Sequence, residues 1–227
     1  MKNLHSGALL LCIALSVFAC KKKEQPITGS AVQPVVQEDD YMQMSYGNYW
    51  IYRYYSIDSN GVETVTSDYD SVCVLKDTMM NGQRYYQYGT FKLQGTPYLS
   101  EIAYLRDSSG YWVNPVGRIM FSSKDVTSIF RTFTYGPNAA TPDTLLITER
   151  MGDIGKVITI DAGTFTTDAF MRTYEFQSGP NKGKKKINYF RYANNVGLVS
   201  DMMFYYFTNN ASIERRLVRY HLYKAIP

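Results

Sequence analysis

The sequence predicts an all-β protein whose antiparallel sheet curls strongly and approaches a barrel. The 227 residues include 21 Tyr, 11 Phe and 2 Trp, and aromatic and β-branched residues favour strands. Short turn signals rich in Gly, Asn and Ser recur along the chain and separate segments of strand length. No segment combines the length and the 3.6-residue apolar period of a convincing long helix.

The predicted curvature follows from the number of strands and from the aromatic residues on both of their faces. A sheet built of consecutive hairpins must bury one face, and a sheet this long either curls on itself or splits into two layers. In the first strand, Tyr52 and Tyr54 lie opposite Ile51 and Tyr55. One face can then form the core while the other stays partly exposed to solvent, with its phenol hydroxyls reaching water. We therefore expect one strongly curled sheet, with a β-sandwich as the alternative.

The individual strands are predicted from apolar alternation between turns. Asn81-Gly82 is the strongest hairpin signal, because both residue types tolerate a positive φ. Residues 124–135 are ambiguous, since their apolar residues have helical spacing while the Thr-rich run also alternates; we expect a strand. Residues 137–142 are predicted to be a loop, and a last hairpin is expected to turn at Asn209-Asn210. The other predicted strands are 50–55, 72–75, 84–93, 102–106, 111–113, 119–121, 144–148, 157–160, 164–176, 184–192, 198–207 and 213–224.

The N-terminal segment predicts export. Residues 1–19 have the pattern of a secretory signal peptide, with Lys2 at the head and an apolar run over 8–18 before a small residue. The run is shorter than the roughly 20 residues that a membrane-spanning helix needs. Residues 20–40 contain Pro, Gly and charged residues without an apolar period, so we expect a flexible tether. A single antiparallel β domain is expected over 41–227.

The stretch Val17-Phe18-Ala19-Cys20 resembles the lipobox of bacterial lipoproteins. In that family a signal peptidase cuts before the Cys, and the thiol and the new amino group carry acyl chains. The resemblance implies that Cys20 is acylated and that acyl chains anchor the protein to a membrane. Two or more chains make such an anchor stable. The alternative is an ordinary cleaved signal peptide with Cys20 unmodified.

Three further motifs resemble those of uncharacterised Bacteroidetes cell-envelope lipoproteins. They are the opening Gly47-Asn48-Tyr49-Trp50, the stretch 192–199 and the closing stretch 216–220. The resemblance implies a β fold in a bacterial cell envelope, and we expect the outer membrane. In that phylum, acidic residues just after the lipidated Cys can direct export to the cell surface. Here Lys21-Lys22-Lys23 follows Cys20 instead. The sequence thus leaves the periplasmic and the cell-surface face both open.

Composition excludes several classes of function. The formal charge of +4, from 24 basic and 20 acidic residues, is too balanced to indicate a nucleic-acid partner. Cleavage would leave His221 as the sole histidine and Cys73 as the sole free thiol, so no disulfide is expected. One histidine without a cysteine cluster does not make a His-rich zinc site. We therefore expect no metal and no cofactor, and we expect Cys73, in an apolar strand, to be buried.

The candidate ligand-binding residues are Trp112, Trp50, Tyr52 and Tyr54. Trp112 lies beside a turn and is the better ligand candidate, whereas core packing is the stronger expectation for Trp50. Both tryptophans could also serve as platforms for sugars. These side chains combine large apolar area with a polar tip, which suits amphiphilic ligands.

No catalytic residue is assigned. Asp68 and Asp70 share a strand face, as paired catalytic carboxylates can, but this spacing is common on solvated strands. No Gly-x-Ser-x-Gly nucleophile elbow occurs. We therefore expect a membrane-anchored, non-enzymatic module that binds an apolar or amphiphilic ligand or a partner protein, since small curled sheets can enclose such a cavity. The alternatives are a glycan-binding accessory lipoprotein and an envelope hydrolase.

Overall fold

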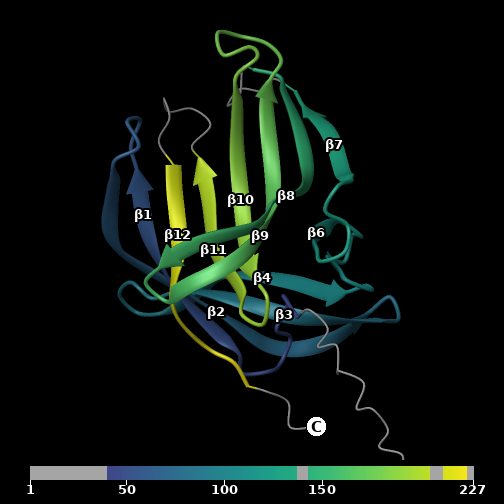
Figure 1. Cartoon of the computed structure of the whole chain (residues 1–227). Helices are drawn as coiled ribbons and strands as arrows, with labels where there is room; N and C mark the ends of the chain where they lie inside the picture. Colours follow the sequence, from purple (N-terminus) through teal and green to yellow (C-terminus); the bar gives the residue numbers. More distant parts are fainter. Residues whose placement is uncertain (1–39, 137–142, 205–211, 224–227) are drawn as a thin grey trace, which may run out of the picture. The chain divides into compact units, whose positions relative to one another are not determined.

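A computed structural model of the chain describes residues 40–136, 143–204 and 212–223, drawn in colour in Figure 1. The predicted signal peptide, Cys20 and nearly all of the tether lie outside the described residues. The predicted loop 137–142 and the predicted turn at Asn209-Asn210 lie outside them too. The described residues contain no helix long and apolar enough to cross a membrane.

The described residues form twelve strands and no helix, which confirms the predicted all-β class. The strands are β1 Tyr49–Ile57, β2 Glu63–Met80, β3 Gln83–Lys92, β4 Tyr98–Asp107, β5 Tyr111–Val113, β6 Ile119–Ser122, β7 Ile129–Tyr135, β8 Leu145–Ile160, β9 Gly163–Phe176, β10 Lys185–Ala193, β11 Gly197–Phe204 and β12 Ser212–His221.

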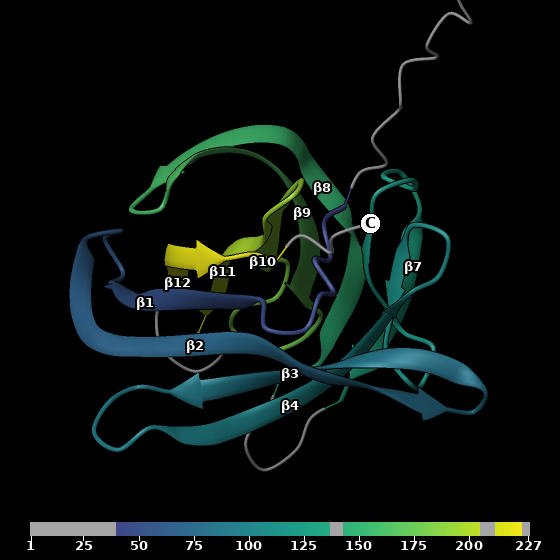
Figure 2. The same cartoon turned by 90° about the horizontal axis from the view of Figure 1, so that it is seen from below.

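These strands make one antiparallel sheet in the order β6-β5-β4-β3-β2-β1-β12-β11-β10-β9-β8-β7. Two meanders, β1–β6 and β7–β12, are therefore joined where β1 pairs with β12. The sheet curls until β6 packs against β8 and β9, with Phe121 in one core cluster with Met151 and Phe170. The sheet of the β domain is thus nearly closed into a barrel, as the sequence predicts (Figure 2).

The β8–β9 hairpin bends sharply at a bulge between Gly152 and Lys156. Asp153 and Gly155 both have positive φ there, 46° and 71°, and a bulge of this kind increases local curvature. The end of the hairpin then folds back across β10–β12 (Figure 1), where the Ala162 N–H donates to the Leu217 carbonyl at 3.2 Å. The prediction of separate strands at 144–148 and 157–160 is therefore wrong, because the bulge bends one strand without ending it.

The ambiguous segment 124–135 becomes a strand only from Ile129 onward. Before it, the Asp125 carboxylate accepts the backbone N–H groups of Thr127 and Ser128 at 3.2 and 3.0 Å. The bonds from Ser128 and Thr127 lower the pKa of Asp125. This turn competes with regular structure through local side-chain bonds, which explains why the first half of the segment is not a strand.

One carboxylate in the interior is completely buried. Glu149, on β8, is 0% exposed and forms ion pairs with Arg118 and with Arg172. The second pair joins Arg172 Nε to Glu149 Oε1 at 2.7 Å. A buried charge of this kind is tolerated only when it is paired and hydrogen-bonded, so the two arginines hold the β6 end of the sheet against β8 and β9.

Candidate ligand-binding cavity

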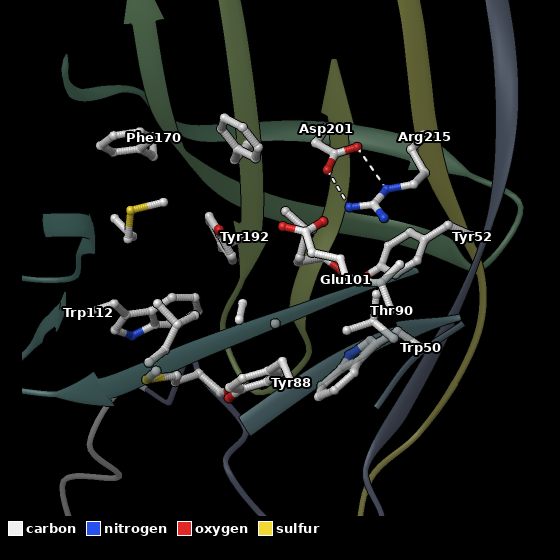
Figure 3. Close-up of a pocket in the computed structure, with 18 residues that line it drawn as sticks. Trp50, Tyr52, Tyr88, Thr90, Glu101, Trp112, Phe170, Tyr192, Asp201 and Arg215 are labelled. Carbon is white, nitrogen blue, oxygen red and sulfur yellow. Dashed lines mark hydrogen bonds and ion pairs between the residues drawn. The ribbon is translucent and has the colours of Figure 1, made fainter. Parts of the chain in front are cut away.

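A cavity of about 230 Å³ lies inside the curled sheet. Its lining comes from β1 to β6 on one side, from β9 to β12 on the other, and from Met42 just before β1. Figure 3 shows aromatic rings around most of the space and charged groups at one end. Because the two meanders face each other across this space, the β1–β12 pairing is what creates it.

The walls are mainly aromatic. Trp50 and Trp112 are 3% and 7% exposed and both face the cavity. The Trp112 ring meets the Tyr192 ring edge-on with the centroids 4.7 Å apart, and Trp50 lies 6.4 Å from Tyr88. Edge-to-face and tilted pairs at these distances are favourable, so the rings hold one another in place.

The polar tips of most wall residues are bonded to backbone carbonyls. Trp50 Nε1 donates to Val196 O at 2.6 Å, and the Tyr52 hydroxyl donates to Leu198 O at 2.8 Å. The Tyr88 hydroxyl donates to the Met42 carbonyl at 2.9 Å. With these groups satisfied, the side chains offer the cavity their ring surfaces.

Tyr192 differs, because its hydroxyl has no hydrogen-bond partner among the described residues. Burial, and then the nearby charge of Asp201, raise the pKa of Tyr192. Burial also raises the pKa of Tyr52 and of Tyr88. All three phenols therefore stay neutral at ordinary pH, and that of Tyr192 can still donate or accept a hydrogen bond.

An ion-pair cluster forms the polar end of the cavity. Arg215 donates two hydrogen bonds to Asp201, from Nε to Oδ1 at 3.0 Å and from Nη2 to Oδ2 at 2.5 Å. Its third nitrogen, Nη1, donates to Asp70 Oδ2 at 3.2 Å, and its guanidinium lies 4.8 Å from the centre of the Tyr52 ring. Burial lowers the pKa of Arg215, but the charge and hydrogen bonds of Asp201 raise it more, so the pKa is above its usual value. Arg215 is permanently charged and fully engaged.

Asp70 belongs to the same ion-pair cluster through its contact with Arg215. It is 1% exposed, accepts a hydrogen bond from the Tyr54 hydroxyl, and lies 2.9 Å from Lys92 Nζ through Oδ1. Asp70 is therefore held by three neighbours and does not line the cavity. The hypothesis that Asp68 and Asp70 act as a catalytic pair gains no support, since Asp70 is committed to structural contacts.

The structure brings three of the four predicted aromatic residues into one site. Trp50, Tyr52 and Trp112 all line the cavity, whereas Tyr54 lies beyond its polar end beside Asp70 and Lys92. Binding of a ligand by these residues stays a prediction. Sequence reasoning missed the residues that complete the lining, chiefly Tyr88, Glu101, Phe170, Tyr192, Asp201 and Arg215. Tyr88 and Tyr192 could have been found from the sequence, because the side chains of the predicted strands 84–93 and 184–192 alternate between the two faces of the sheet.

Cys73 and His221 take no part in this cavity. Cys73 is a free thiol that is half-buried rather than buried as expected. It lies on the face of β2 that carries Ser71 and Leu75, which are also only partly buried, whereas the buried Val74 points to the opposite face. Burial raises the pKa of this thiol. His221 is exposed and stacks on Tyr49 with the ring centroids 5.8 Å apart. In the described part of the chain, no three His, Cys, Asp or Glu side chains form a group that could hold a metal ion.

These features define a class of protein: an all-β domain whose curled sheet encloses an aromatic cavity. No protein-family model matches the chain, and no curated protein matches it. Similar solved structures include a "putative lipoprotein" of Parabacteroides distasonis, with a TM-score of 0.41, and a "putative exported protein with YmcC-like fold" of Bacteroides fragilis, with a TM-score of 0.45. Each is 12% identical to this chain and covers 81% of it, and in each case 99% of the other chain is matched. No residue role is transferred from either.

Proposed function

We propose that the domain binds an amphiphile, with the apolar part in the aromatic cavity and the polar part at its charged end. The observation that carries this proposal is the combination of aromatic walls with a single polar end at Tyr192, Asp201 and Arg215. Ligand sites are typically apolar cavities with a few well-placed polar groups. The Tyr192 hydroxyl, which has no hydrogen-bond partner within the described part of the chain, is the group best suited to a ligand hydrogen bond.

The size of the cavity limits the ligand. An apolar cavity of about 150 Å³ accepts benzene, and sites for drug-sized ligands begin at about 300 Å³. At about 230 Å³, the cavity suits one short alkyl chain or the end of a longer one. A whole two-chain lipid would exceed it.

The other two hypotheses fit the site less well. A sugar platform needs an open aromatic face, and Trp50 and Trp112 are almost fully buried. A hydrolase working through paired carboxylates needs both of them free to act in the cleft. Of the two carboxylates in the lining, Glu101 and Asp201, Asp201 is bonded through both oxygens to Arg215. These observations favour binding of an amphiphile.

Titration of the intrinsic fluorescence tests the proposal. Both tryptophans of the chain, Trp50 and Trp112, line the cavity, so a bound chain should change their emission directly. We expect saturable changes with fatty acids or single-chain phospholipids and none with soluble glycans. A response to glycans alone would favour the accessory lipoprotein, and no response to either would favour a role in binding a protein partner.

We also propose that the protein is an envelope lipoprotein anchored through acyl chains on Cys20, with the outer membrane as the expected location. The lipobox-like stretch supports this proposal. Cys20→Ala is expected to block lipoprotein processing and to alter the retention of the protein in the membrane fraction. Mass spectrometry of the mature N-terminus checks the modification; an unacylated wild-type N-terminus with unchanged processing of the variant would contradict it.

A further inference from the structure

The charges around the cavity distinguish between classes of amphiphile, provided that the proposed function holds. We infer that the cavity selects an amphiphile with a positively charged head, such as an alkylammonium, over one with a carboxylate or phosphate head. Among the described residues, the charged groups in the lining are Glu101, Asp201 and Arg215. Their partners decide which charges remain for a ligand.

The positive charge of Arg215 is already neutralised. Its Nε and Nη2 are bonded to Asp201, and its Nη1 is bonded to Asp70. Lys92, the other cation of this cluster, contacts Asp70 at 2.9 Å and does not line the cavity. Two carboxylates thus face two cations, and this cluster offers no net positive charge to an anionic head. Displacing either carboxylate would leave a buried charge unpaired, which is costly.

Glu101 is the third charged residue of the lining, and its charge is not neutralised by the cluster. It lies on β4, is exposed, and has no ion-pair partner among the described residues. It stands opposite Thr90 in the β3–β4 pairing, and Figure 3 shows it on the same side of the cavity as Tyr52 and the Asp201–Arg215 pair. An exposed carboxylate at the rim of a cavity attracts a cationic head and repels an anionic one.

The aromatic walls also favour a ligand with a positively charged head. The faces of Trp and Tyr rings attract cations through the ring quadrupole, and quaternary ammonium ligands are recognised in this way. The interior already contains one such contact, the Arg215 guanidinium over the Tyr52 ring at 4.8 Å. Tyr88, Tyr192 and Trp50 offer further ring surfaces around the remaining space.

Three single-chain probes with cationic, neutral and anionic heads test this inference: octyltrimethylammonium, octanol and octanoate, each below the concentration at which it forms micelles. Binding to the full chain carrying Cys20→Ala is measured by tryptophan fluorescence and by calorimetry. We expect the ammonium to bind most tightly and the octanoate least. Glu101→Gln should weaken ammonium binding roughly five-fold, which corresponds to about 1 kcal/mol, and leave octanol binding unchanged. The preference should also shrink with added salt, because Glu101 is exposed.

Glu175→Gln is the matched control. It removes the same charge at a position that is paired with Lys185 on the surface at 3.0 Å and is absent from the cavity lining. Ammonium binding that is weakened in Glu101→Gln but not in Glu175→Gln supports the inference. Equal binding of the three probes, or tighter binding of octanoate, overturns the charge preference while leaving the proposed function intact. Failure of all three probes to bind overturns both.

Discussion

Arg215→Met is expected to destabilise the protein by about 3–5 kcal/mol, because breaking a buried ion pair leaves its partner charged and uncompensated. Arg215, Asp70 and Asp201 have side chains that are 17%, 1% and 7% exposed. The methionine would keep the apolar contact with Tyr52 but would leave Asp201 without an ion-pair partner. Asp70 would retain Lys92 and Tyr54. For a domain of this size the midpoint of thermal unfolding should fall by roughly 6–20 °C.

Urea unfolding monitored by circular dichroism measures this change. Arg219→Met is the matched control, since Arg219 lies on the same strand, is exposed and loses the same charge; surface changes of this kind usually alter stability by less than about 0.5 kcal/mol. Adding Asp201→Asn to Arg215→Met should recover part of the lost stability, because it removes the carboxylate charge that Arg215 no longer neutralises. Equal stabilities of Arg215→Met and Arg219→Met would show that the cluster contributes nothing to folding.

Ala103→Phe is expected to weaken binding of an octyl amphiphile at least 100-fold, or about 2.7 kcal/mol. Ala103 lies on β4 opposite Tyr88 and faces the cavity. A phenyl ring added there would occupy the space that the ligand needs. Since a smaller cavity of about 150 Å³ already accepts benzene, the ring should fit without large strain, and the stability of the fold should be preserved.

The neighbouring residue provides the control for this substitution. Ile102 is 43% exposed, pairs with Gly89 on the opposite face of the same strands, and does not line the cavity. Ile102→Phe adds a comparable ring outside and should leave binding unchanged. Unimpaired binding in a folded Ala103→Phe variant would mean that the ligand binds elsewhere.

Local sequence signals predict much of this fold. Asn81 and Gly82 indeed turn the β2–β3 hairpin with positive φ values of 51° and 73°. The alternation that places Trp50 and Tyr52 on one face holds in the structure. The same alternation also placed Tyr54 with them, but Tyr54 lies past the end of the cavity, since Asp70 and Lys92 occupy the space in front of it.

The polar end of the cavity could not be predicted from local signals. Asp70 and Arg215 meet across 145 positions of sequence, and they do so only because β1 pairs with both β2 and β12. Nothing within either strand specifies this long-range pairing. The bulge at Asp153 to Gly155 was missed for the opposite reason, since local turn residues suggested that a strand ends where it only bends.

The position of an amphiphile bound inside the curled sheet can be measured directly. Crystals of the protein grown with an octyltrimethylammonium analogue brominated at the chain end would locate the bromine by anomalous scattering. We predict a bromine peak among Trp112, Phe170 and Phe190, the last of which lines the cavity with its ring centroid 6.1 Å from that of Phe170, and an ammonium group toward Glu101 and Tyr192. A bromine on the outer surface, with the cavity unchanged, would contradict it.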